Sequence, residues 1–592
     1  MKKIWIVLIC SLSVGSLFAQ GKIAPDVQAT LQAGKLADVL VIFDHPADIS
    51  RAKNMRSKNE KATYVFSQLQ QNAAKTQQNA LKLLQDNDVN VQSLFLVNAL
   101  AVQNANASLL QTLAAMPEVR AITADPWIHF DGPPTVPESV LVANSRDEVA
   151  WGITKIQAPE VWNLGYTGQG ISVGGADTGY DWTHPAIQAK YRGWTGDEAT
   201  SEHAYNWHDA IHELSPLNND STGNPGTNPC GLDVQTPCDD GNHGTHTMGT
   251  MTGNDGQGNI IGVAPGAHWV GCRNMERGWG KPSSYLECFQ WFLAPTDLGG
   301  LNPDPSRAPH VINNSWYCAQ EEGCVDTVTH QLLRQAIINL REAGVVVVVS
   351  NGNSGPNCNT TTEAAAYFEE SFSVGATRED DFIAAFSSRG TVLLDGSNRM
   401  KPNVSAPGQN VRSSISGGEY ANFSGTSMAG PHVVGLVALM LSANPALAGH
   451  VEDIEDIIEQ TALYFADTLD CGASLGTAHP NHAYGWGRVD ALGAVQAALA
   501  WQPAVSTASP VLPQARVTPN PVHGEAIFRL ENLSGTSVLE ILDAEGRRIA
   551  YQQWTASTSE TRRISMENQA AGIYFWKLTS GNGVASGKIL KM

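Results

Sequence analysis

The stretch Asn422-Phe-Ser-Gly-Thr-Ser427-Met-Ala-Gly-Pro-His432 leads directly into an apolar run, Val433 to Met440. The small residues predict a tight turn, and the apolar run predicts a buried helix that begins at this turn. Backbone N–H groups at a helix N-terminus lack partners and favour negative charge. Ser427 is therefore either the N-cap of a core helix or a nucleophile whose attack on a carbonyl creates an oxyanion there. The choice depends on whether a base, an acid and a further oxyanion donor occur elsewhere in the chain.

The overall composition predicts an exported protein with several domains. The chain has 592 residues, too many for one hydrophobic core, and its formal net charge of −20 argues against nucleic acid or an anionic membrane surface as partner. Lys2 and Lys3 precede a short apolar run that ends at Ala19, which is typical of a signal peptide over residues 1–19. No later segment is apolar over the length of a membrane span, so we expect no integral membrane segment.

The cysteine content predicts disulfide bonds. Of nine cysteines, Cys10 falls within the signal peptide, which leaves an even number in the exported chain. Short loops favour two pairs, Cys230 with Cys238 and Cys318 with Cys324. The pairing of the other four stays open: Cys272, Cys288, Cys358 and Cys471.

Residues 36–130 are expected to form a small α+β unit. Its elements follow in the order β-α-β-β-α-β, which is the ferredoxin-like pattern. They are a strand at 37–43, a long helical stretch at 53–84, strands at 89–95 and 98–103, a helix at 108–116 and a strand at 119–123. Residues 131–148 are rich in Pro and polar residues, which indicates an exposed linker where a protease could cut.

Residues 149–500 predict an α/β domain with three layers. Continuous apolar strands separated by helical stretches imply a mainly parallel sheet that helices cover on both faces. The expected strands lie at 171–176, 269–271, 310–313, 345–349 and 373–375. After a linker over residues 501–515, residues 516–592 contain short alternating strands split by turn residues, which predict a small β-sandwich.

Three chemically matched side chains lie in the α/β domain. Asp177 follows the strand 171–176, and His243 stands in a Gly-rich turn that runs into an expected helix. A neutral imidazole can take the proton of Ser427 during attack, and a buried carboxylate can fix the tautomer of that imidazole. Asn353 follows the buried strand 345–349 and supplies an amide donor for the oxyanion. Together these residues favour the nucleophile over the cap as the role of Ser427.

Four motifs now resemble the signatures of subtilisin-like serine peptidases, and their context resembles the bacillopeptidase F-like branch. The motifs are Asp177-Thr-Gly, His243-Gly-Thr-His, Gly352-Asn353-Ser-Gly-Pro and Gly425-Thr-Ser427-Met-Ala-Gly-Pro-His. The resemblance implies a subtilisin-like fold and a secreted serine endopeptidase that works through an acyl-enzyme. It implies Asp177 as the orienting acid, His243 as the base, Ser427 as the nucleophile and Asn353 as the oxyanion donor. It also implies Ser315 and Trp316 as substrate-binding residues.

The flanking units resemble accessory domains. Residues 36–130 resemble a subtilase propeptide, which blocks the cleft until the linker 131–148 is cut. The last unit resembles the C-terminal sorting domain of the type IX secretion system, in the motifs Thr518-Pro-Asn-Pro521, Asp543-Ala-Glu-Gly546 and Ala571-Gly-Ile-Tyr574. A generic carbohydrate-binding sandwich is the alternative for this unit. The implied partners are protein or peptide substrates, the chain's own propeptide and the secretion machinery, and the implied location is extracellular or at the cell surface after passage through the periplasm.

The sequence predicts no cofactor for catalysis and no metal ligand set. The family resemblance implies a structural Ca²⁺ without locating it, since the Asn- and Asp-rich loops at 218–228 and 254–259 lack EF-hand spacing. His203, His208 and His212 could ligate a metal, but a solvated insertion is favoured, and His246 is expected to be structural.

Two departures from the family pattern concern the substrate pocket. Ser350-Asn351 stands where the family usually has Ala-Ala, and no proline follows Tyr367, so the specificity at this pocket is not predicted. A catalytically idle surface-binding protein and a narrow processing protease are the other functions considered.

Overall fold

The computed structural model describes residues 21–130, 149–218, 228–316, 327–471, 475–503 and 513–592, the last range without 534, 556–558 and 582. The chain divides into two compact units, Met1–Trp501 and Gln502–Met592. The expected signal peptide, the linker 131–148 and the pair Cys318 with Cys324 lie outside the described residues.

A parallel seven-stranded sheet is the centre of the first unit, with strand order β13-β12-β11-β10-β6-β8-β7. The five strands expected from the sequence correspond to β6, β8, β10, β11 and β12, so the predicted mainly parallel α/β sheet is confirmed. The strand bounds are β6 Ser172–Asp177, β7 Trp207–Asp209, β8 His268–Arg273, β10 Val311–Asn314, β11 Val346–Ser350, β12 Phe372–Thr377 and β13 Val404–Pro407. A hairpin of β14 (Val411–Ile415) and β15 (Glu419–Phe423) lies outside this sheet.

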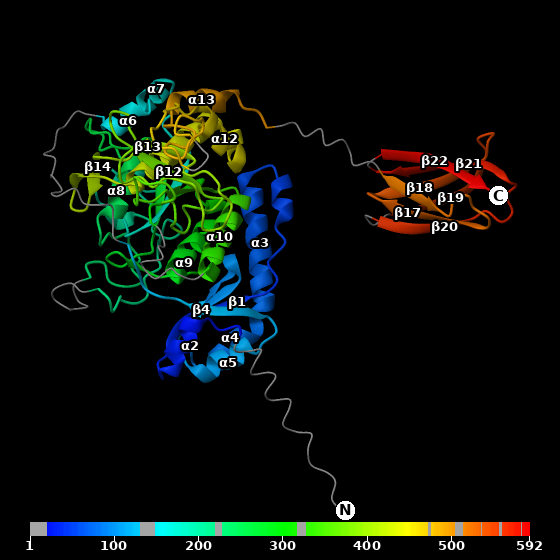
Figure 1. Ribbon diagram of the computed structural model, residues 1–592, viewed down its shortest axis with the longest axis horizontal. Coiled ribbons are helices and arrows are strands. Elements are labelled where there is room, and N and C mark those ends of the chain that lie inside the picture. Colours follow the sequence, from blue (N-terminus) through cyan, green and yellow to red (C-terminus); the bar gives the residue numbers. More distant parts are fainter. Residues whose placement is uncertain are drawn as a thin grey trace, which may run out of the picture. The chain divides into compact units, whose positions relative to one another are not determined.

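Helices cover both faces of the sheet. Successive side chains along a strand point to opposite faces, and on each face they pack into a separate apolar cluster with the helices. On β11, Val346 and Val348 belong to one cluster, and Val347 and Val349 belong to the other. Helices α8 and α11 pack on the first face, and α9 and α10 on the second (Figure 1). The helix bounds are α6 Trp151–Lys155, α7 Ala158–Asn163, α8 His243–Thr252, α9 Pro282–Leu293, α10 Thr327–Glu342, α11 Thr426–Ala443, α12 Val451–Thr461 and α13 Ala491–Ala500.

Helix α11 is the central helix of the first face. Among the described residues it is the one helix whose length and hydropathy would suit a membrane span, yet 89% of that window is buried inside the fold. Such burial is typical of a core helix in a large α/β domain. The small residues of α11 allow this packing, because a Cβ on Gly435 would meet the side chain of Val263. The apolar run after Ser427 is therefore core packing, as the sequence indicates.

Residues 37–124 form a separate antiparallel sheet with order β2-β3-β1-β4, which is the ferredoxin-like arrangement. The strands are β1 Ala37–Phe43, β2 Val91–Leu94, β3 Ala99–Ala105 and β4 Val119–Ala124, and the helices are α2 Pro25–Gln32, α3 Lys58–Thr76, α4 Gln78–Asp86 and α5 Ala107–Ala114. Helix α2 was not predicted, and its Val27 is buried in the same core, so this unit begins before residue 36.

The helical stretch expected at 53–84 contains two helices that meet at Gln77. Helix α3 begins at a capping box made by Ser57 and Glu60 and ends at Thr76, and Gln77 is both its C-cap and the N-cap of α4. The side chain of Gln77 is buried, donates to Asn98 Oδ1 (3.2 Å) and accepts from Ser93 Oγ (2.6 Å). These tertiary contacts divide a stretch that is uniformly helix-forming in composition.

The second unit is a β-sandwich of two antiparallel sheets, with orders β16-β17-β20 and β19-β18-β21-β22. Alternate residues from both sheets fill one core, for example Phe528 from β17 and Trp576 from β21. The predicted sandwich is confirmed. The bounds are β16 Gln514–Thr518, β17 Glu525–Glu531, β18 Thr536–Leu542, β19 Arg548–Thr555, β20 Ser559–Ser565, β21 Gly572–Ser580 and β22 Gly583–Lys591.

Three disulfides connect described cysteines. Cys230–Cys238 confirms the short-loop pairing expected from the sequence. The four cysteines whose pairing stayed open form Cys272–Cys288, which joins β8 to α9, and Cys358–Cys471, which spans 113 positions of sequence.

Candidate active site

Asp177 and His243 meet at the end of strand β6. Asp177 is the last residue of β6 and His243 the first residue of α8, and both side chains are buried. Nδ1 of His243 lies 2.7 Å from Oδ1 of Asp177, and the amide of Thr178 donates to the same oxygen (2.8 Å). A carboxylate at Nδ1 selects the tautomer that leaves Nε2 able to accept a proton. Within the described part of the chain, Nε2 of His243 makes no hydrogen bond.

Ser427 is the second residue of α11 and is buried at its N-terminus. Its Oγ donates to the carbonyl of Ser315 (3.2 Å), and Ser315 Oγ donates back to the carbonyl of Ser427 (2.9 Å). The structure thus brings Asp177 to His243 and Ser427 to Ser315, with α11 packed against α8. No hydrogen bond joins Ser427 to His243 among the residues described.

Asn353 lies beside the first turn of α11. Its Oδ1 accepts from the amide of Thr426 (2.9 Å) and from Thr426 Oγ1 (3.0 Å). Its Nδ2 is buried and has no hydrogen-bond acceptor in the described ranges. Hydrogen bonds to Thr426 therefore fix Oδ1 of Asn353, while its Nδ2 remains free to donate to a ligand at the start of α11.

Asn351, the departure from the family pattern, does not displace Asn353. Its Nδ2 donates to Ser388 O (2.7 Å) and to Thr361 Oγ1 (3.2 Å), which ties the strand end to two neighbouring loops. The extra amide is thus used within the fold, and the loop that carries Asn353 remains in place.

Trp316 and Ser315, expected at the substrate site, follow strand β10. The indole of Trp316 is buried and stacks on Tyr285 with ring centroids 4.1 Å apart. It shares one apolar cluster with Ile128 and Phe130 from the N-terminal unit. Trp316 is therefore part of the apolar core that residues 128–130 also join.

That segment, residues 128–130, runs past the histidine. Strand β5 (Ile128–His129) pairs antiparallel with β9 (Trp279–Gly280), and the amide of Phe130 donates to Gly278 O (2.7 Å). The ring of Phe130 packs edge-on against the ring of His243, with centroids 5.0 Å apart. Sequence reasoning missed β9, because two residues beside a glycine carry no periodic signal.

His246, which is also buried, has structural partners. The Nε2 of His246 lies 3.0 Å from Val411 O and its ring stacks on Phe423, while burial lowers the pKa of His246 to about 3. It is a neutral core residue, as the sequence predicted.

The insertion histidines contact a glutamate. His208 and His212 both lie within hydrogen-bond distance of Glu287, whose carboxylate raises the pKa of His212 to about 10. In the described part of the chain, no group of three or more His, Cys, Asp or Glu residues is arranged to hold a metal ion.

The architecture and the site define a three-layer α/β protein with an Asp-His pair at a strand end and a serine at the start of the central helix. The subtilase family model matches residues 168–487, which is more than half of the chain. The chain therefore belongs to the subtilase family of serine peptidases. Catalysis in this family needs no cofactor.

Curated relatives agree with this assignment. The chain is 32% identical to Bacillopeptidase F of Bacillus subtilis (strain 168) over 505 residues, which cover 81% of this chain and 32% of that protein. It is 28% identical to M-protease of Shouchella clausii (strain KSM-K16), with 60% of this chain and 76% of that protein covered. It is 26% identical to Subtilisin E of Bacillus subtilis (strain 168), with 63% and 79% covered. The chain thus spans about a third of Bacillopeptidase F.

The second unit has its own match. The model of the secretion system C-terminal sorting domain covers residues 516–592, which is the β-sandwich. The sequence resemblance for this unit is confirmed, and the protein is extracellular or attached to the cell surface.

Proposed function

We propose that this chain is a secreted serine endopeptidase that hydrolyses peptide bonds with Asp177, His243 and Ser427. The observation that carries the proposal is the 2.7 Å contact between His243 Nδ1 and Asp177, which leaves Nε2 unpaired near the helix that bears Ser427. The family membership of residues 168–487 supports the same chemistry.

In the proposed reaction, His243 acts as the base and then as the acid. Ser427 Oγ exchanges its contact with Ser315 O for His243 Nε2, loses its proton to that nitrogen and attacks the substrate carbonyl. Asp177 stabilises the imidazolium that forms. Collapse of the tetrahedral intermediate expels the amine, which takes the proton from His243, and water then hydrolyses the acyl-enzyme by the same steps.

The oxyanion of the intermediate is proposed to lie between Asn353 Nδ2 and the backbone N–H of Ser427. Both donors are fixed before the substrate arrives, since Asn353 is anchored through Oδ1 and Ser427 belongs to α11. One preplaced donor of this kind contributes about 2.7–4 kcal/mol to transition-state stabilisation. The reaction as described uses protein groups alone. A structural Ca²⁺ remains a proposal without a site, and EDTA would lower the Tm if one is bound.

The substrate is proposed to bind as an extended strand. Residues 128–130 lie next to His243 and pair antiparallel with β9, as an extended peptide substrate would. Ser315 and Trp316 would then contact the substrate on the opposite side, which keeps their expected role as a proposal.

Residues 36–130 are proposed to act as an inhibitory propeptide, released after a cut within 131–148. Apolar side chains of both domains share one cluster, with Val65 and Leu96 on one side and Phe289 and Leu333 on the other. Figure 1 places α3 alongside α10. Polar contacts fix the orientation, since Gln290 accepts from the amide of Leu96 (3.0 Å) and donates to Ser93 O (3.1 Å).

The test is hydrolysis of an unfolded protein such as casein by the activated chain, combined with a fluorophosphonate probe. Labelling of Ser427 and loss of hydrolysis in Ser427→Ala would support the proposal. An intact chain that neither cleaves nor reacts would favour the idle surface-binding protein instead. Cleavage profiles on a peptide library would separate a broad endopeptidase from a narrow processing protease. The type IX secretion machinery is the proposed partner of residues 516–592.

A further inference from the structure

A carboxylate outside the Asp-His-Ser set links the two elements that carry the acid and the base. Oδ1 of Asp239 accepts from Thr178 Oγ1 (2.8 Å) and from the amide of Gly241 (2.9 Å). Its Oδ2 accepts from the amide of Thr245 (3.0 Å) and from Thr245 Oγ1 (2.5 Å). Thr178 follows Asp177, and Thr245 lies two positions after His243. The Asp239 carboxylate is therefore bonded both to the neighbour of Asp177 and to a residue in the first turn after His243.

The start of helix α8 depends on this carboxylate. The cap residue Asn242 has a left-handed backbone (φ 62°), and its side chain makes no capping hydrogen bond within the described structure. The free N–H groups of the first turn are satisfied from outside: Gly244 N donates to Thr178 Oγ1 (3.0 Å), and Thr245 N donates to Asp239. Since His243 is the first residue of α8, the position of its ring follows from these contacts.

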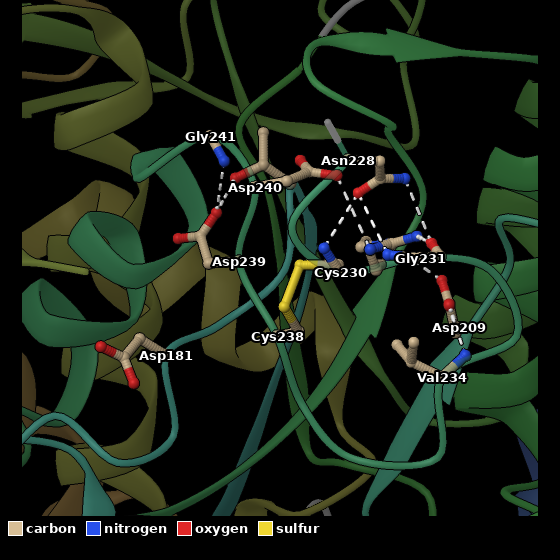
Figure 2. Close-up of a disulfide and its surroundings, with 12 residues drawn as sticks. Asp181, Asp209, Asn228, Cys230, Gly231, Val234, Cys238, Asp239, Asp240 and Gly241 are labelled. Atoms are coloured by element: carbon tan, nitrogen blue, oxygen red, sulfur yellow. Dashed lines mark hydrogen bonds and ion pairs between the residues drawn. A yellow bond between two sulfur atoms is a disulfide. The ribbon is translucent and has the colours of Figure 1, made fainter. Parts of the chain in front are cut away.

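A disulfide lies next to Asp239, as Figure 2 shows. Cys238, bonded to Cys230, precedes Asp239 directly, and its carbonyl accepts from the amide of Tyr180 (3.0 Å). Gly179 forms an antiparallel bridge with Asp239, and a Cβ on Gly179 would overlap the Cys238 carbonyl. The segment 238–239 thus lies tightly against the turn that follows Asp177.

The Cys230 end of the disulfide is bonded to strand β8 of the sheet. Gly231, next to Cys230, accepts through its carbonyl from Arg273 Nη2 (2.6 Å). Arg273 is the last residue of β8, is fully buried and pairs with Asp209 (3.0 Å). The disulfide loop is therefore fastened to a strand adjacent to β6.

We propose that Asp239 is a positioning residue for the reaction: through Thr178 and Thr245 it sets the alignment of Asp177 with His243, and the Cys230–Cys238 disulfide holds it there. This inference rests on the proposed peptidase function. Asp240 is the matched control, because the partners of its carboxylate are Arg277 and Arg273 and not the two threonines. Its Oδ1 accepts from the amide of Arg277 (3.0 Å), and its Oδ2 lies 3.6 Å from Arg273.

The experiment compares Asp239→Asn with Asp240→Asn in the full chain after activation, with kcat calculated per site titrated by a fluorophosphonate. An asparagine retains the shape, but its NH₂ group must face either the amide of Thr245 or the amides of Gly241 and Asn242. A backbone N–H cannot accept a hydrogen bond, so the contacts on that side are lost. We expect kcat to fall at least tenfold, with KM changed by less than about twofold, while Asp240→Asn stays within about twofold of wild type. The double variant with Thr178→Val should lose no more than the larger single loss.

A second readout does not depend on activity. The Nδ1–H proton of His243, hydrogen-bonded to Asp177, should give a downfield proton NMR signal that shifts or broadens in Asp239→Asn and not in Asp240→Asn. The variant Cys230→Ser/Cys238→Ser should show the same change with a smaller loss of kcat. If Asp239→Asn does not fold, Thr245→Val removes a link from the other side and carries the same expectation.

The inference is overturned if Asp239→Asn matches Asp240→Asn in kcat per titrated site and in the proton signal, or if its whole loss lies in KM. An inactive wild type with an intact, Asp239-dependent proton signal would instead contradict the proposed function and leave the positioning role supported.

Discussion

Phe130 lies edge-on against His243, with ring centroids 5.0 Å apart, and its amide is bonded to Gly278. The segment that ends the N-terminal unit therefore reaches the histidine that the proposed reaction uses as its base. Under the proposed function, a residue in this position would exclude substrate for as long as it stays. The contact would then connect the fold of residues 36–130 with control of the active site.

Replacing Phe130 by alanine should weaken the inhibition. Loss of a buried aromatic contact costs about 1–3 kcal/mol, so the cleaved propeptide should dissociate about 5- to 150-fold more readily from the processed complex. The lag before full peptide hydrolysis measures this change. Leu36→Ala, which alters an exposed residue of the same unit, is the control and should keep the wild-type lag. An unchanged lag in Phe130→Ala would show that this contact does not restrain the enzyme.

Inhibition should strengthen as the pH rises above about 7. Lys58 on α3 is buried against the peptidase domain, where it donates to Ala308 O (2.7 Å), and burial together with the charge of Arg192 lowers its pKa to about 7. His310 also interacts with Lys58, but burial lowers the pKa of His310 to about 3, so it stays neutral above pH 7. The docked state thus binds fewer protons than the released state, so docking weakens as the pH falls toward 7 and is constant below it.

The dissociation of the processed complex between pH about 7 and about 10 measures this effect. It should slow with rising pH by less than tenfold per pH unit, which is the limit for one proton. Lys58→Met should remove the dependence, and a wild-type rate that is flat or rises with pH would contradict the assignment to Lys58.

Asn353→Ala should lower kcat by about 10²- to 10³-fold with little change in KM, because its Nδ2 donor is proposed to act only on the oxyanion. Steady-state hydrolysis of a short peptide tests this expectation. Asn357→Ala changes an exposed amide in the same loop and should be neutral. A loss that appears in KM alone would assign Asn353 to substrate binding instead.

Removing the disulfide Cys358–Cys471 should reduce stability without affecting the chemistry. It connects residues 113 positions apart, and closing so long a loop stabilises a fold by about 2–5 kcal/mol. The variant Cys358→Ser/Cys471→Ser should inactivate faster on heating and keep its kcat per titrated site at 25 °C. A large fall in that kcat would mean that the bond also shapes the site.

Short-range sequence patterns mark the residues of the proposed site more clearly than its surroundings. Asp177, His243 and Asn353 each follow an apolar strand or stand in a Gly-rich turn, so short-range patterns locate them, and the parallel sheet brings strand ends together. The break at Gln77 could not be predicted, because it depends on contacts with Asn98 and Ser93. The pairing of Cys272 with Cys288 likewise depends on how α9 packs on β8.

The two-residue strand β9 has no signal of its own, although the substrate is proposed to bind along it. Its identity emerges only from the antiparallel pairing with Ile128–His129. The role of Asp239 is equally hidden in the sequence, since an aspartate in a Gly-rich turn reads as ordinary turn chemistry. Its contacts with Thr178 and Thr245 become visible only when β6 and α8 are placed together.

The most direct test of the account is the variant Ser427→Ala, measured for peptide hydrolysis, fluorophosphonate labelling and processing of its own chain. We predict that wild type digests casein and is labelled at Ser427. The variant should lose hydrolysis by at least about 10⁴-fold, take up no label and accumulate uncut between residues 130 and 149. Full hydrolysis by Ser427→Ala, or labelling of a different serine in wild type, would contradict the central claim.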